Sequence, residues 1–295
     1  MQKLYAYLQL VRLPAVFTAM ADVFLGFLLT HKSFEPALDF GLLLLASSCL
    51  YLAGMVFNDV FDRKTDAQER PGRPIPSGRV SVTQAVGLGV LLFVAGIGAA
   101  NVVGKNALHI VLGLTACVLA YDGFLKRTWF GPAAMGGCRF LNVMLGASAT
   151  FFVWARPQLL IAAALGVYVI GLTWFARTEA VRSSSRQLIA SAVIVNLGLA
   201  GLVAFVAMWD GGQADPKLVL MILAVIMLTI NRRLMAAIFE PSPQKVQPAI
   251  KTMLLSLVML DASIILFHRG DTTYALAAVA LLVPSLLLSR WISVT

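Results

Sequence analysis

The sequence predicts an all-α protein that crosses a membrane many times, and three observations support this. The chain has 295 residues, of which 59% are hydrophobic and only 13% are charged, with a mean hydropathy of +0.85. Since ordinary soluble domains carry about 25% charged residues, this composition excludes a soluble globular protein. Apolar runs long enough to span a bilayer recur along the chain, and basic residues gather in every second connection between them.

The first half of the chain contains five predicted spans. A helix needs roughly 20 mostly apolar residues to cross about 30 Å of hydrocarbon. Runs of about this length lie at 14–30, 37–57, 82–103, 106–121 and 132–153. The fourth run is short. Residues 58–81, between the second and third runs, are polar and long enough to form structure outside the membrane.

The second half adds five more runs, at 157–176, 187–208, 216–238, 250–267 and 273–291. The ninth run is short, and residues 239–249 form the other long connection. No low-complexity segment or long linker divides the chain. We therefore expect one transmembrane domain over residues 1–295, built as a helical bundle of nine to ten spans.

The basic residues predict the orientation of the bundle. The two ends and the even-numbered connections hold 17 of the 23 Lys and Arg residues. Lys and Arg are retained on the cytoplasmic side of short loops, so both termini are expected to be cytoplasmic, the C-terminal one through Arg290. The excess of positive charge on that face can attract lipid headgroups or an anionic substrate. Nucleic acid is not an expected partner, because no soluble basic domain exists to bind it.

An acidic motif stands at the inner end of the second run. Asn58, Asp59, Asp62 and Asp66 form N-D-x-x-D-x-x-x-D within the segment NDVFDRKTDAQERPGRPIPSG. If the helix continues, the spacing i, i+3, i+7 places the three carboxylates on one face. At separations of about 6 Å, each pair would repel by about 3 kcal/mol. Mg²⁺, which prefers oxygen ligands, water and phosphates, would offset that repulsion. A solvated, charged helix end explains the motif equally well.

Basic residues surround these carboxylates. Arg63, Lys64, Arg70, Arg73 and Arg79 follow along the chain, while prolines and glycines between residues 71 and 78 must end the helix and turn it back. Such a loop suits a metal-bridged diphosphate, because Arg supplies forked donors to phosphate oxygens. A second polar group, YDGFLKR at residues 121–127, ends the fourth run on the same side.

These segments resemble the UbiA superfamily of intramembrane prenyltransferases. NDVFDRKTDAQERPGRPIPSG is similar to the family's first aspartate-rich motif, and YDGFLKR resembles its Y-x-x-x-K-R element with one extra residue. The match in order and topology runs from about residue 10 to residue 267. The resemblance implies a helical bundle, typically of nine spans, with a central cavity that opens at the cytoplasmic side.

The resemblance also implies a reaction and its residues. Members transfer a prenyl group from a polyprenyl diphosphate to a small acceptor, such as an aromatic ring, with Mg²⁺ as cofactor. Mg²⁺ would be held on the diphosphate by Asn58, Asp62 and Asp66, with Asp59 in support. The diphosphate oxygens would be bound by Arg73, Lys126 and Arg127. Tyr121 would lie beside the allylic carbon, so the expected catalytic residues are Asp62, Asp66, Tyr121 and Lys126.

The second aspartate-rich motif of the family is altered in this chain. The corresponding stretch, WFARTEAVRSSSRQ, contains one acidic residue, Glu179, which is the remaining candidate metal ligand. Arg177 and Arg182 could bind the diphosphate in place of a second metal, since Arg pairs with phosphate bidentately. Unaltered two-metal chemistry and a non-catalytic role stay open. Segments such as GLTWFARTEAVRSSSRQ resemble the branch called UbiA-like EboC.

Ionisable residues inside the spans are functional candidates by default. Arg139, Asn142 and Asp22 lie at similar depth, and we expect them to bind the diphosphate or an acidic acceptor. The alternative is a buried ion pair of Arg139 with Asp22 or Asp122 that stabilises the bundle. Asp261, deep in the ninth run, is expected to be structural.

The predicted function is therefore Mg²⁺-dependent prenyl transfer inside the bilayer, from a polyprenyl diphosphate to a small-molecule acceptor. Two alternatives come from other classes: a non-catalytic prenyl-lipid-binding protein and a lipid transporter. Transporters often contain inverted repeats and polar sites near the midplane, whereas the polar residues here concentrate at one surface. The three cysteines lie in apolar stretches and are expected to be packing residues.

Overall fold

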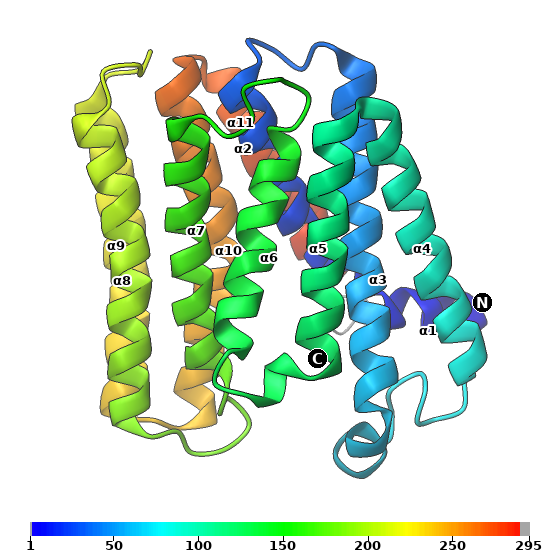
Figure 1. The fold of residues 1–295 in the computed structure, drawn as a ribbon. Helices are drawn as coiled ribbons and strands as arrows, with labels where there is room; N and C mark the ends of the chain where they lie inside the picture. The colour runs from blue at the N-terminus through cyan, green and yellow to red at the C-terminus, as the bar shows by residue number, and fades with distance from the viewer. Residues whose placement is uncertain (1, 290–295) are drawn as a thin grey trace.

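The computed structural model describes residues 2–289, which form a helical bundle without β-strands. The helices are α1 (Gln2–Leu10), α2 (Val16–Thr30), α3 (Ala37–Glu69), α4 (Val82–Val103), α5 (Lys105–Gly123), α6 (Gly131–Gly146), α7 (Arg156–Ala176), α8 (Ser185–Met208), α9 (Pro216–Phe239), α10 (Pro243–Arg269), α11 (Thr272–Ala280) and α12 (Leu282–Ser289). Two 3₁₀ turns, η1 (Leu13–Ala15) and η2 (Leu125–Arg127), precede α2 and α6. Figure 1 shows the long helices side by side, and the predicted all-α bundle is confirmed.

The number of spans is close to the prediction. Within residues 2–289, nine helical stretches are long and apolar enough to cross a membrane, and each matches one predicted run. The one remaining predicted run, 132–153, has no such stretch, because its helix α6 ends at Gly146 after 16 residues, or about 24 Å. The Ser148 hydroxyl then donates to the Leu145 carbonyl at 2.6 Å, and turns continue to residue 154.

The last predicted run, 273–291, is divided at Leu281 into α11 and α12. Its final two residues, Arg290 among them, lie outside the described residues.

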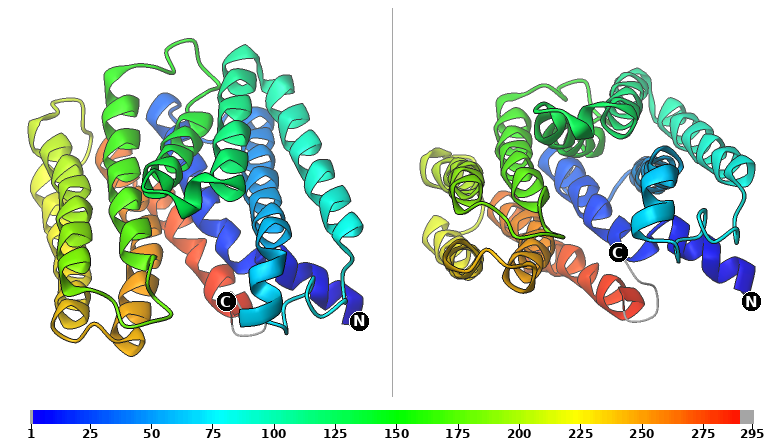
Figure 2. Two further views of the ribbon diagram at one scale, coloured as in Figure 1. Left: turned by 60° about the horizontal axis from the view of Figure 1, so that its bottom comes forward. Right: turned by 90° about the horizontal axis from the view of Figure 1, so that it is seen from below.

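The segments with the predicted motifs share one end of the bundle. The connections α3–α4, α5–α6, α7–α8 and α9–α10 all lie at the lower end in Figure 1. Figure 2 shows that α1 and α12 lie at this end too, where the Ser285 hydroxyl donates to the Pro14 carbonyl at 2.8 Å. The structure thus collects the even-numbered connections on one face. That this face is cytoplasmic stays a prediction.

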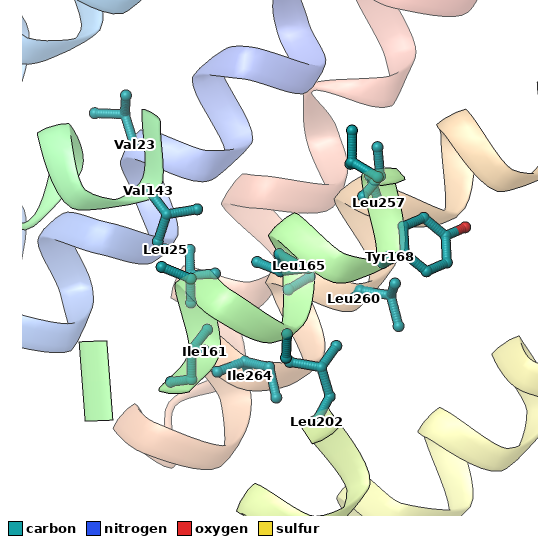
Figure 3. Packing of buried hydrophobic residues seen from close by; sticks show 14 of the residues in the cluster. Val23, Leu25, Val143, Ile161, Leu165, Tyr168, Leu202, Leu257, Leu260 and Ile264 are labelled. Carbon is teal, nitrogen blue, oxygen red and sulfur yellow. The ribbon is translucent and has the colours of Figure 1, made fainter. Parts of the chain in front are cut away.

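The core lies around α2, α7 and α10. Figure 3 shows side chains of α7, including Leu165 and Tyr168, packed against α2, α6, α8 and α10. In the most apolar stretch of α10, 72% of the residues are buried, against 28% in that of α4. Leu91 and Val94 are among the apolar side chains that α4 exposes on the outside of the bundle. Exposed apolar side chains on a spanning helix suit contact with lipid.

Two glycines bring α2 and α6 together. A Cβ on Gly146 would lie 2.7 Å from the Val23 backbone, and one on Gly26 would clash with the Val143 carbonyl. This close approach places Asp22 of α2 opposite Asn142 of α6.

Candidate active site

The first acidic motif lies on the last three turns of α3, which continues as a helix to Glu69. One Arg73 nitrogen, Nη1, bonds Asp66 Oδ2 at 2.7 Å and Asp59 Oδ1 at 3.3 Å. Arg12 Nη2 lies 2.9 Å from the same oxygen of Asp59. Both aspartates are almost fully buried. The turn-back of residues 70–80 therefore brings its own arginine onto the two carboxylates spaced i, i+7.

The other two motif residues contact the end of α5 and η2. Lys126 Nζ lies 2.7 Å from Asp62 Oδ2, and the exposed Arg127 lies 3.4 Å from Asp62 Oδ1. The Asn58 amide donates to Asp122 Oδ1 at 2.8 Å. Because Asn58 and Asp62 are one helical turn apart, they point to the same side of α3. Asp62 is the most accessible of the three motif aspartates.

The carboxylates of this region face an equal number of cations. Asp59, Asp62, Asp66 and Asp122 lie opposite Arg12, Arg73, Lys126 and Arg127. The protein's own cations thus relieve the repulsion that the spacing predicts. Within residues 2–289, no group of three or more His, Cys, Asp or Glu side chains has the arrangement of a metal site.

The donor set suits a metal that brings further ligands with it. Asn58 donates through its nitrogen, so its side-chain oxygen remains available, and Asp62 Oδ1 meets only the long contact to Arg127. Mg²⁺ is usually bound by one or two carboxylates together with waters and substrate phosphates. Asn58 and Asp62 fit that mode, whereas an all-protein cage is absent from the described residues.

A pocket of about 240 Å³ opens between α5, η2, α6 and α7. Its lining consists of Tyr121, Lys126, Gly131, Pro132, Thr173, Ala176, Arg177 and Glu179. The volume lies below the roughly 300–1,000 Å³ of sites for drug-sized ligands, so it suits a compact polar group. Lys126 belongs to both the pocket and the Asp62 ion pair.

The connection after α7 supplies two of these lining residues. Arg177 Nη2 donates to the Thr128 carbonyl at 2.6 Å, and its guanidinium lies 6.0 Å from the centre of the Trp129 ring. Burial raises the pKa of Glu179, while Arg70 and Arg12 partly oppose that shift. The altered second motif therefore places one cation and one carboxyl group in the same pocket as Tyr121.

Arg182 lies elsewhere. It lines a second pocket of about 340 Å³ together with Glu240, Pro241, Ser242 and Pro243. The backbone N–H of Ser183 donates to the Pro241 carbonyl at 3.0 Å, which holds this part of the loop against the α9–α10 connection. The structure therefore does not bring Arg182 to the pocket that Arg177 lines.

The polar residues within the spans form a separate, buried network. Arg139 Nη2 lies 2.7 Å from Asp22 Oδ1 and 3.4 Å from Asp261 Oδ2. The Asn142 amide donates to Asp22 Oδ2 at 2.7 Å, and Ser47 donates to Asn142 at 2.6 Å. None of these residues lines either pocket. The geometry thus matches the alternative of a buried ion pair, with Asp22 rather than Asp122 as the partner.

Three participants were not among the predicted site residues. Arg12 adopts a left-handed backbone conformation at φ 47° between α1 and η1, and no spacing rule links it to Asp59. Asp122 is adjacent to Tyr121, so its position in the sequence could have indicated that it belongs to the site. Asp261, which was expected to be structural, completes the buried network around Arg139.

Known relatives share this architecture. Digeranylgeranylglyceryl phosphate synthase of Saccharolobus solfataricus is 33% identical over 149 residues, which cover 50% of this chain and 53% of the relative. The enzyme of that name from Methanosarcina mazei is 33% identical over 176 residues, covering 55% and 61%. The chain thus spans about half the length of the curated relatives it matches.

Solved structures show the same fold over nearly the whole chain. A UbiA homolog from Aeropyrum pernix K1 has a TM-score of 0.68 at 18% identity and covers 85% of this chain and 97% of its own. A UbiA homolog from Archaeoglobus fulgidus, bound to GPP and Mg²⁺, has a TM-score of 0.66 at 15% identity, covering 93% and 99%. A sequence model of the UbiA prenyltransferase family matches residues 19–237. This multi-pass integral membrane protein therefore belongs to the UbiA prenyltransferase family.

Proposed function

We propose that this protein transfers a prenyl group from a polyprenyl diphosphate to a small nucleophilic acceptor inside the membrane. The observation that carries the proposal is the pocket of about 240 Å³ between α5, η2, α6 and α7. It joins Tyr121 and Lys126 of the YDGFLKR element to Arg177 and Glu179 of the altered second motif, with Asp62 in contact through Lys126.

The diphosphate would occupy this pocket. Lys126 and Arg177 would bind its oxygens, and Arg127, beside Asp62, would join them at the rim. Asn58 and Asp62 would hold Mg²⁺, which when bound neutralises the leaving group and so favours its departure. Asp66 and Asp59 would contribute through Arg73, which could move from these carboxylates to the phosphate.

Arg177 would neutralise the diphosphate in place of the second metal ion that the family's second aspartate-rich motif binds. Glu179 is the one acidic residue in the stretch between α7 and α8, and a lone carboxylate with a raised pKa is a weak ligand set for a second ion. A guanidinium supplies two parallel donors to a phosphate. We therefore favour a site with one metal ion and an arginine.

The chemistry balances as prenyl diphosphate plus an acceptor with a hydrogen to give the prenylated acceptor, diphosphate and a proton. Cleavage of the allylic C–O bond leaves an electron-poor prenyl carbon. Tyr121 would lie beside that carbon, and the surrounding apolar helices would exclude water that could otherwise capture it. Fixed donors aimed at the leaving diphosphate supply the electrostatic stabilisation.

The relatives suggest the class of acceptor. The two relatives described above are named digeranylgeranylglyceryl phosphate synthase, so we place a glyceryl phosphate with a free hydroxyl first in a panel of acceptors. An aromatic acceptor comes second. The basic face around the pocket would attract an acceptor that carries a phosphate.

The test uses purified protein in liposomes with Mg²⁺ and a panel of polyprenyl diphosphates. We expect diphosphate release that depends on an acceptor, and its loss in Asp62→Ala. Asp39→Ala is the matched control, because Asp39 lies in the first turn of the same helix. Binding of prenyl diphosphate without turnover would identify a lipid-binding protein instead. Passage of intact ligand across the vesicle wall would identify a transporter.

A further inference from the structure

Two cysteines on neighbouring helices face each other inside the bundle. Cys117 lies on α5 and Cys138 on α6, and both are free and half-buried. Cys117 Sγ donates to the Ala134 carbonyl at 3.2 Å. Ala134 lies one turn before Cys138, so both residues are on the same face of α6. The sulfur of Cys117 therefore lies directly on the surface of α6.

Small residues on α6 make this contact possible. A Cβ on Gly137 would lie only 3.4 Å from Cys117 Sγ, so a larger side chain there would press against the sulfur. The third cysteine, Cys49, is in a different setting. It is buried on α3 and faces α4, where a Cβ added to Gly96 would lie 3.2 Å from the Cys49 Cβ.

We propose that Cys117 and Cys138 form a redox-sensitive dithiol that closes into a disulfide between α5 and α6. The oxidant is a low-molecular-weight disulfide. One cysteine sulfur, as thiolate, attacks it, forms a mixed disulfide and releases one small thiol. The second cysteine then displaces the other small thiol. Two protein thiols are oxidised to one S–S bond, and the small disulfide is reduced to two thiols.

The position of this bond gives it a consequence for the pocket. Tyr121 follows Cys117 by one turn of α5, and Gly131 and Pro132 begin α6. All three line the 240 Å³ pocket. A bond between Cys117 and Cys138 would tie these two walls together. Both cysteines are free in the structure, so the open dithiol is the form from which the bond would close.

The test counts thiols in the full-length protein in detergent micelles, without reference to prenyl transfer. The protein is treated with oxidised glutathione, denatured, and labelled with a maleimide. We expect two of the three thiols to be lost, with label remaining on Cys49, and peptide mapping to find Cys117 linked to Cys138. Dithiothreitol should restore all three thiols.

Variants supply the controls. Cys49→Ser should still form the bond, while Cys117→Ser and Cys138→Ser should each prevent it. Three labelled thiols after oxidation of the wild-type protein would overturn the proposal. So would glutathione adducts without an internal bond, or a link between two copies of the chain. These outcomes are read from the wild-type protein, so they stand even where a variant fails to fold.

Discussion

Arg139 is the one cation in the described part of the bundle that faces two fully buried carboxylates, and its replacement by Met is the most direct test of the packing described above. Its guanidinium lies 2.7 Å from Asp22 and 3.4 Å from Asp261, and both aspartates are 0% exposed. Arg139→Met would leave buried carboxylate charge uncompensated. Removing one partner of a buried ion pair costs about 3–5 kcal/mol.

The network joins four helices, so this loss should affect the whole bundle. Ser47 on α3 donates to Asn142 on α6, and Asn142 in turn donates to Asp22. At about 2–4 °C per kcal/mol for a chain of this size class, we expect the melting temperature of Arg139→Met to fall by on the order of 10 °C. Circular dichroism of the protein in detergent would measure it.

A rescue experiment separates charge from shape. The triple variant Arg139→Met, Asp22→Asn, Asp261→Asn removes both carboxylates with the guanidinium, and replacing a buried ionic group as a unit is often nearly neutral. We expect it to recover most of the lost stability. Arg156→Met, at the exposed start of α7, should melt like the wild type. If Arg139→Met melts within about 2 °C of wild type, or the triple variant is no more stable than the single one, the reasoning is refuted.

Two other comparisons use matched pairs of variants. Arg177→Ala should weaken binding of a prenyl diphosphate roughly tenfold or more, because hydrogen bonds to charged groups contribute about 1.5–3 kcal/mol. Arg182 lines the other pocket, so Arg182→Ala should leave the Kd within about twofold. Equal effects of the two variants in a binding titration would contradict the separation of the two pockets. Gly136→Ala should lower the melting temperature, since its Cβ would lie 2.6 Å from the Gly166 carbonyl and overpacking costs about 1–3 kcal/mol. Gly98→Ala, with nothing within 4 Å, should not lower it, and similar melting of the two would argue against close packing of α6 on α7.

The residue spacing in the sequence predicted the arrangement of motif residues along α3, which helix geometry determines. The predicted common face of Asp59, Asp62 and Asp66 depended on the helix continuing beyond the membrane run, and α3 does extend to Glu69. In the structure Asp59 and Asp66 share Arg73, whereas Asp62 contacts Lys126. The partners of these residues depended on tertiary structure. Arg12 reaches Asp59 from the turn between α1 and η1, where its backbone is left-handed.

The interior network shows the same division. The sequence indicated Arg139 as unusual because cations inside spans are costly. It could not choose between Asp22 and Asp122, since both lie at plausible depths. The choice follows from Gly26 and Gly146, which let α2 and α6 approach closely. Similarly, the apolar run 132–153 was too long as a predicted helix, because hydropathy does not register the turn at Ser148.

The balance of charge at the C-terminal end of α3 predicts that metal and diphosphate bind together. Each motif aspartate is held by a cation, Asp62 by Lys126 at 2.7 Å and Asp66 by Arg73 at 2.7 Å. Mg²⁺ alone must compete with these ion pairs, and diphosphate alone must compete for the same cations. When both arrive, Lys126 and Arg73 can move to phosphate oxygens while the carboxylates turn to the metal. Each ligand then relieves the competition that the other meets.

Such coupling is reciprocal and typically amounts to about 1–3 kcal/mol. We therefore expect Mg²⁺ to bind about tenfold more tightly when saturating inorganic diphosphate is present, as measured by isothermal titration. Lys126→Gln frees the Asp62 carboxylate, so it should raise the affinity for Mg²⁺ alone and reduce the coupling. Equal Mg²⁺ affinity with and without diphosphate in the wild-type protein would mean that the ion pairs do not gate the site. In that case the four cations around α3 would serve only to hold the N-terminal segment, the loop of residues 70–80 and η2 against that helix.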